Sequence, residues 1–76
     1  MQYDVTLDVK GLNCPLPLLR LKQSLSKLKP GDVIQVIATD PAAHLDIGVF
    51  IDNSSHQMLS HERQDDIQYF YIKKAG

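Results

Sequence analysis

Cysteine is almost absent from this 76-residue chain: Cys14 is the only one, and tryptophan is missing altogether. A single cysteine excludes an internal disulfide. Structural zinc sites gather about four ligands at close spacing, and the histidines at positions 44, 56 and 61 form no such cluster with Cys14. We therefore expect no metal site and a fold stabilised by apolar packing, for which an apolar content of 43% is adequate.

Long apolar segments are also missing. No stretch approaches the roughly 20 apolar residues of a membrane helix, and residues 1–10 lack the basic start and apolar run of a secretory signal. A lone unpaired cysteine is typical of proteins in a reducing compartment. The sequence thus predicts one domain over residues 1–76, located in the cytoplasm, away from membranes and monomeric when free.

Net charge is small, at −1, which argues against tight non-specific binding of nucleic acids. The distribution is nevertheless uneven. Residues 9–31 contain five basic side chains and no acidic one, whereas residues 32–71 contain seven acidic side chains and only Arg63 as a base. The basic segment is either a solvated helix face or a surface on which a partner protein docks beside Cys14.

The first half of the chain predicts a strand, a helix and a second strand. Apolar and polar residues alternate from Tyr3 to Val9, as in a half-buried strand. Leucines then recur at spacings of three and four over residues 18–28, which indicates an amphipathic helix that Pro30-Gly31 stops. Val33 to Thr39 is β-branched and apolar and predicts a central strand.

A second helix is expected from Asp40, as N-cap, with Pro41 as its first helical residue. Its apolar pattern is less regular, because Asp46 interrupts it and Gly48 weakens it. We therefore expect a break near residues 46–48 and the end of the helix at residues 53–55.

Two further strands are predicted at residues 57–62 and 67–73, joined by a turn over residues 63–66. The order β-α-β-α-β-β predicts an α/β chain of the α+β two-layer sandwich type, with a mixed four-stranded sheet and both helices on one face. In the last strand, Phe70 and Ile72 are expected to face the helices, and Tyr69 and Tyr71 to lie on the open face as ordinary strand aromatics.

The segment around Cys14 carries the chemistry. With Cys14 as the N-cap of the first helix, Pro15 and Pro17 fall in the first turn, which tolerates proline and is stiffened by it. The positive end of a helix favours a thiolate and lowers its pKa, with help from Lys10 and Arg20 if they lie near. The alternative is an inert, buried cysteine.

Cys14-Pro15-Leu16-Pro17 resembles the C-P-x-P motif of the TusA/SirA-like sulfur-carrier family. The residues around Leu7-Asp8, Gly11-Leu12, Pro30-Gly31 and Thr39-Asp40-Pro41-Ala42 match the pattern of that family in order and spacing, so the resemblance covers essentially the whole chain. Members of that family share a β-α-β-α-β-β two-layer fold, so the resemblance implies the same element order that the sequence pattern predicts.

The resemblance implies a sulfurtransferase-like carrier with a covalent persulfide on Cys14. Its partners would be a cysteine desulfurase or another sulfur donor, and a downstream acceptor protein; the carrier itself needs no cofactor. In one branch the sulfur reaches tRNA uridine by relay. Pro15, Pro17, Arg20 and Asp40 are further motif or partner-contact positions, and Asp40 has helix capping as its alternative role.

Two residues depart from the family pattern. Leu16 stands between the two prolines where the tRNA-thiolation branch has glutamate, and Asp46-Ile47-Gly48-Val49 stands in the middle of the second helical region, where the family often has proline. The competing hypothesis is a regulatory or protein-binding module in which Cys14 is structural. Direct RNA binding rests on fold analogy alone.

Overall fold

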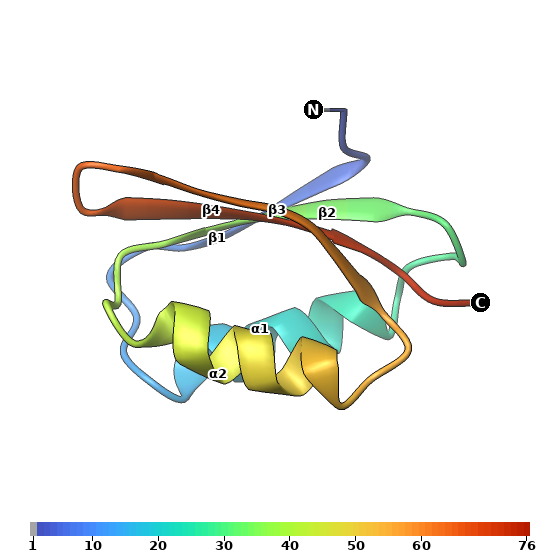
Figure 1. The fold of residues 1–76 in the computed structure, drawn as a ribbon, viewed down its shortest axis with the longest axis horizontal. Coiled ribbons are helices and arrows are strands. Elements are labelled where there is room, and N and C mark those ends of the chain that lie inside the picture. Colours follow the sequence, from blue (N-terminus) through green and yellow to red (C-terminus); the bar gives the residue numbers. More distant parts are fainter. Residues whose placement is uncertain (1) are drawn as a thin grey trace.

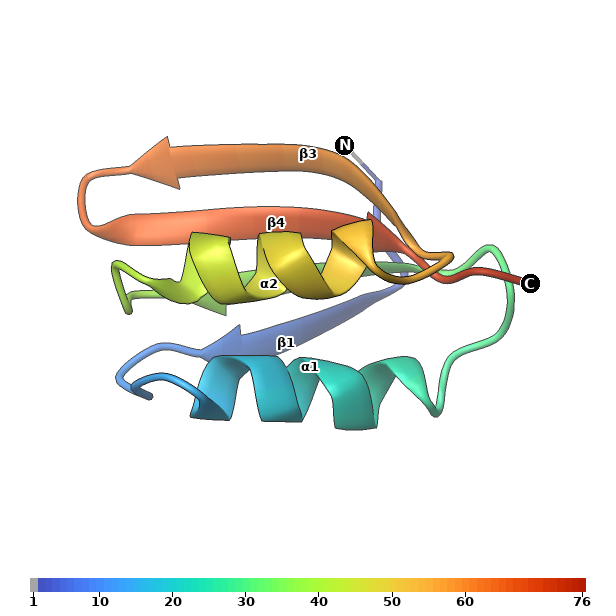
Figure 2. The ribbon, with the colours of Figure 1, turned by 60° about the horizontal axis from the view of Figure 1, so that its bottom comes forward.

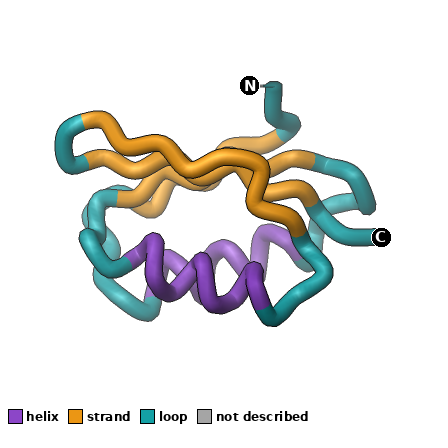
Figure 3. Tube along the Cα trace, viewed as in Figure 1, coloured by secondary structure: helices purple, strands orange, loops and turns teal. Residues whose placement is uncertain are grey.

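Four strands and two helices follow one another in the expected order in the computed structural model, which describes residues 2–76. Both helices cover one face of the sheet, and the other face is open (Figure 1; Figure 3). The predicted α+β two-layer architecture is thereby confirmed. The elements are β1 (Val5–Val9), α1 (Leu16–Leu25), β2 (Val33–Ala38), α2 (Ala43–Asp52), β3 (Gln57–Gln64) and β4 (Ile67–Lys73).

The sheet is mixed, with the strand order β1-β2-β4-β3. β1 pairs with β2 in parallel, and β4 pairs antiparallel with both β2 and β3. β4 lies between β2 and β3, so only the first strand–helix–strand unit joins neighbouring strands. Seen from the helix side, α1 covers the β1 side of the sheet and α2 the β4 side (Figure 2).

The core lies between the helices and the sheet. Alternate residues of each strand point to this face, and β2 and β4 supply most of them because they are the central strands. In β4, Phe70 and Ile72 are fully buried there, as predicted. The buried apolar cluster comprises Val9, Leu21, Leu25, Ile34, Val36, Ala38, Ala43, Ile47, Ile51, Phe70 and Ile72.

α1 is shorter than predicted. It ends at Leu25, although the first strong stop signal in the sequence is Pro30-Gly31. Beyond Ser26 the backbone bonds run from residue i to i−3, as in Leu28 N–H to the Leu25 carbonyl oxygen (3.1 Å). The Lys74 ammonium also donates to that carbonyl (2.8 Å). The chain therefore tightens into turns before the proline is reached.

α2 is continuous, so the predicted break at residues 46–48 is wrong. Its core face consists of Ala43, Ile47 and Ile51, spaced four residues apart, and this face is uninterrupted. Asp46 lies beside that face and does not enter the core. An added Cβ at Gly48 would meet no atom within 4 Å, so this glycine serves no close approach.

The remaining boundaries differ by a few residues. β1 begins at Val5, two residues after its predicted start, and β3 extends to Gln64. The hairpin turn is consequently reduced to Asp65 and Asp66, and Asp65 takes a left-handed backbone conformation with φ of 56°. Aspartate is one of the few residues other than glycine that accept it. Neither helix within residues 2–76 has the length and apolarity to cross a membrane.

Substitution of Leu21 by alanine is expected to lower the free energy of unfolding by about 2–5 kcal/mol, the usual cost of truncating a fully buried leucine. Leu21 is 0% exposed, whereas Leu19 on the same helix is 45% exposed. The matched Leu19→Ala change should therefore cost only about 0.5 kcal/mol. Urea unfolding followed by circular dichroism measures both, and equal losses in the two variants would contradict this packing.

Candidate functional site: the Cys14 loop and two carboxylates

The parallel pairing of β1 with β2 determines where Cys14 lies. Val9 and Ala38, the last residues of these strands, are paired with each other. The segments that follow them, residues 10–15 and 39–42, therefore emerge at the same edge of the sheet. Gly11, the second residue of the first loop, has a left-handed backbone conformation (φ of 82°), which glycine adopts without strain. Its N–H donates to Thr39 Oγ1 (2.9 Å), so the two loops are joined.

Cys14 is exposed and is held at two points. Its backbone N–H donates to Asp40 Oδ2 (2.7 Å). Its thiol donates through Sγ to Asp46 Oδ2 (2.6 Å). Asp40 follows β2 and Asp46 lies in the first turn of α2. Residues far apart in the sequence thus fix both the backbone and the side chain of the only cysteine.

Asp40 acts differently from the predicted N-cap. The N-cap residue of α2 is Ala42, and the helix begins at Ala43, so Pro41 lies before the helix. Asp40 Oδ1 accepts the Ala42 N–H (3.1 Å), while Oδ2 accepts the Cys14 N–H. The backbone carbonyl of Asp40 accepts Gln68 Nε2 (3.0 Å). Its carboxylate therefore connects the Cys14 loop to the turn that precedes α2.

The two motif prolines also occupy other positions than predicted. Pro15, which follows a cis peptide bond, is the N-cap of α1, and its carbonyl accepts the Leu19 N–H (3.1 Å). Cys14 therefore lies one residue before the cap. Pro17 is the second helical residue and is buried. The Leu16 amide donates to the Asn13 carbonyl (2.9 Å).

The pKa of the Cys14 thiol is raised, which contradicts the lowered value expected at a helix tip. The hydrogen bond to Asp46 is the largest cause, followed by the partial loss of solvation and by the negative charges of Asp46 and Asp40. A carboxylate that accepts the thiol proton stabilises the neutral form, and nearby negative charge disfavours the thiolate. At neutral pH the thiol therefore stays protonated.

Neither of the cations expected to assist Cys14 is among the causes of its pKa shift. Lys10 pairs with Asp8, with 3.7 Å between Nζ and Oδ2. Arg20 is exposed on α1. The charged groups that act on the thiol are thus acidic, although the sequence places Cys14 in a basic segment. The fold brings these acids in from the second half of the chain.

Asp46 is the site residue that the sequence analysis missed. Its signal was present as an acidic residue interrupting an apolar helix pattern, and it was interpreted as a break. A charged residue beside a buried helix face has two explanations: an irregular helix or a polar partner across the interface. Only the tertiary structure supplies the partner, which is Cys14.

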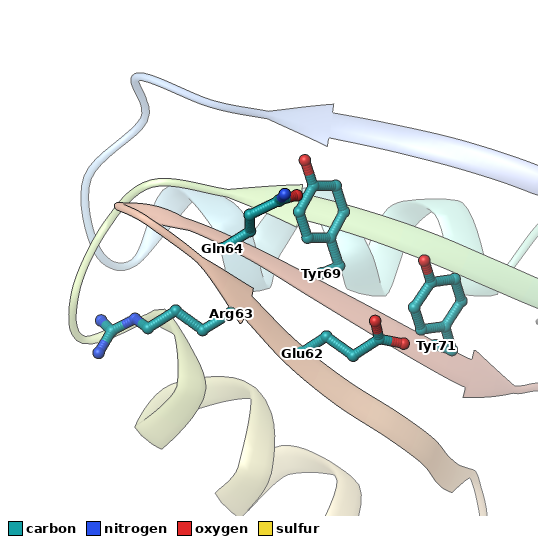
Figure 4. Close-up of a pocket in the computed structure, with 5 residues that line it drawn as sticks. All are labelled: Glu62, Arg63, Gln64, Tyr69 and Tyr71. Carbon is teal, nitrogen blue, oxygen red and sulfur yellow. The ribbon is translucent and has the colours of Figure 1, made fainter.

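The open face of the sheet carries Tyr69 and Tyr71, as predicted (Figure 4). Tyr71 Oη accepts Gln35 Nε2 (3.0 Å), and Gln35 Oε1 accepts Thr6 Oγ1 (3.0 Å). Tyr71 is consequently part of a hydrogen-bonded layer across three strands. The pocket on this face is lined by Glu62, Arg63, Gln64, Tyr69 and Tyr71 and lies on the opposite side of the sheet from the helices (Figure 4).

Comparison with known proteins identifies relatives over nearly the whole chain. The model of the family described as "Sulfurtransferase TusA" matches residues 5–74. The sulfur carrier protein TusA of Allochromatium vinosum is 38% identical over 73 residues, covering 96% of this chain and 96% of the relative. The protein of the same name from Pseudomonas fluorescens is 39% identical over 74 residues, covering 97% and 89%.

The fold has a counterpart among solved structures. A SirA-like protein from Desulfitobacterium hafniense superposes with a TM-score of 0.83 at 21% identity, covering 96% of this chain and 100% of the other. At this identity the likeness establishes the fold alone. It supports the two-layer β-α-β-α-β-β architecture derived above.

Alkylation of Cys14 by iodoacetamide should have its half-maximal rate above pH 8.5, the usual pKa of a cysteine. A raised pKa means less thiolate at any given pH, and the thiolate is the reactive form. Asp46→Asn removes the charge that retains the proton and should shift the profile to lower pH. The matched control Asp52→Asn, on the same helix, should leave the profile unchanged. A profile of Asp46→Asn that superposes on the wild type would refute the assignment.

Asp40→Ala is expected to reduce the free energy of unfolding by about 1–3 kcal/mol, because two backbone N–H groups lose a charged acceptor. Asp40→Asn retains one oxygen acceptor and should lose less. Urea unfolding of both variants measures the difference. Wild-type stability in Asp40→Ala would show that the carboxylate does not hold the two loops together.

Proposed function

Because this chain belongs to the sulfurtransferase TusA family, we propose that it is a sulfur carrier and that Cys14 holds the transferred sulfur as a persulfide. One observation carries the proposal most directly. The only cysteine is exposed on a loop whose backbone is fixed by Asp40, so a macromolecular donor has access to a thiol of defined position.

The carrier cycle consists of two exchanges. Cys14 sulfur attacks the outer sulfur of a donor persulfide, the donor S–S bond breaks, and the donor leaves as a thiol after taking up a proton. Cys14 then carries –S–SH. A thiolate of the acceptor attacks the outer sulfur, and Cys14 is released as a thiol. Sulfur oxidation states balance between the two partners, so the cycle needs no external oxidant and no second cysteine.

The competing hypothesis of a structural cysteine has less support. A cysteine that serves packing lies in the core, whereas Cys14 is exposed and absent from the buried apolar cluster. The rate of alkylation at low pH does not separate the two hypotheses, because the pKa of the Cys14 thiol is raised in either case.

Exposed apolar side chains beside the site favour protein partners. Leu16 follows Cys14 by two residues and is 45% exposed, and Leu45 precedes Asp46 and is 60% exposed. Exposed apolar groups near a reacting atom are typical of surfaces that other proteins cover. We propose that a cysteine desulfurase or another sulfur donor, and then an acceptor protein, dock here. Arg20 and Lys22, both exposed on α1, offer charged contacts to such a partner.

Which molecule finally receives the sulfur depends on the acceptor protein. Delivery toward tRNA uridine is one route in the family, and Leu16, in place of glutamate, counts against that particular relay. We expect the carrier to work in the cytoplasm, where a lone thiol stays reduced. Direct nucleic-acid contact is not part of the proposal, because Asp40 and Asp46 surround the reacting thiol with negative charge.

Incubation with a cysteine desulfurase and cysteine should increase the intact mass by one sulfur atom, reversibly on treatment with dithiothreitol. Cys14→Ala should gain nothing, because it has no other thiol. Intact-mass spectrometry measures both. Wild-type protein without the gain, or an equal gain in Cys14→Ala, would exclude the carrier function.

A further inference from the structure

The Cys14–Asp46 hydrogen bond creates a difficulty for the proposed reaction. Sulfur transfer begins with attack by a sulfur anion, yet the thiol donates its proton to a carboxylate 2.6 Å away. Asp46 is half-buried on a ten-residue helix anchored in the core by Ile47. The Asp46 carboxylate therefore cannot be withdrawn from Cys14 by a displacement of α2. Some change at Asp46 has to precede efficient transfer.

The charged groups that face Cys14 are few. From the segment after β2 comes Asp40, at the Cys14 backbone, and from α2 comes Asp46, at the thiol. Lys10, in the same loop as Cys14, has its ammonium near Asp8 instead. Within residues 2–76, no cation forms an ion pair with either of these two carboxylates. A compensating positive charge has to come from the molecule that brings the sulfur.

We infer that Asp46 is a positioning residue of sulfur transfer: it holds the Cys14 thiol through its proton and releases it when a cationic group of the sulfur donor pairs with the carboxylate. This inference rests on the proposed carrier function and adds a property of the donor. A cation beside Asp46 neutralises the charge that retains the proton, and the thiol ionises next to the incoming persulfide. An anionic donor meets the repulsion of both carboxylates and leaves the proton in place.

The transfer remains balanced in this scheme. As Asp46 becomes paired, the thiol proton of Cys14 passes to solvent. The new bond then forms between the Cys14 sulfur and the outer sulfur of the donor, and the donor S–S bond breaks. The departing donor thiolate takes up a proton. Asp46 touches the reacting thiol only through that proton and forms no covalent bond.

Three small persulfides of matched size test the inference: those of cysteamine, 2-mercaptoethanol and 3-mercaptopropionate, which carry positive, zero and negative charge. Rates of mass gain on Cys14 at low ionic strength should fall in that order, with the cationic donor about fivefold or more ahead of the anionic one. Since all three react with the same thiol, the ratio of rates is independent of how much of it is ionised. Added salt should reduce the ratio.

Asp46→Asn should lower the ratio of cationic to anionic donor toward one, with Asp40 accounting for what remains, and Asp52→Asn should keep the wild-type ratio. Wild-type rates within about twofold of one another, or an unchanged ratio in Asp46→Asn, would overturn the inference while leaving the carrier function in place. Failure of the desulfurase to load the wild type would remove the carrier function itself.

A second measurement keeps the test decisive if small persulfides fail to load the protein. Cationic and anionic methanethiosulfonates modify thiols without any sulfur-carrier activity. Their rate ratio on folded protein, divided by the ratio on urea-unfolded protein, should exceed one in the wild type and fall in Asp46→Asn. A normalised ratio of one in the wild type contradicts the inference.

Discussion

The parallel pairing of β1 with β2 is the constraint on which the rest of the site depends. Parallel neighbours send their following segments out of the same edge of a sheet, and here these are the Cys14 loop and the turn before α2. The bonds from Gly11 to Thr39 and from Cys14 to Asp40 then join two segments nearly thirty residues apart. Without this register, the thiol would have neither its backbone anchor nor its acidic neighbour.

The element order and the layer arrangement were predictable because they follow from strong local signals. β-branched runs, leucines at helical spacing and apolar–polar alternation from Tyr3 to Val9 each extend over several residues, so errors at single positions do not change the outcome. Boundaries were less predictable. α1 ends where Lys74 and a series of turns take over, and Lys74 lies at the other end of the chain.

The sequence predicted Cys14 as the candidate site residue but gave the wrong direction for the pKa of its thiol. Cys14 could be recognised from its prolines and from a family pattern, both of which are local. Its ionisation is set by Asp46, which is 32 residues away. A helix-tip argument considers only the segment that contains the cysteine, and here it gave the wrong direction. Net charge along the sequence misled in the same way, since the acids that surround the thiol come from a different segment.

The protonated thiol has a consequence for the lifetime of the empty carrier. An exposed lone cysteine on a small protein is a natural target for peroxide and for disulfide formation with a second copy or with glutathione. Each of these reactions proceeds through the thiolate. By keeping Cys14 neutral, the Asp46 hydrogen bond slows oxidative damage while the carrier awaits a donor. The same contact that delays attack on the donor persulfide therefore also keeps the thiol intact for that attack.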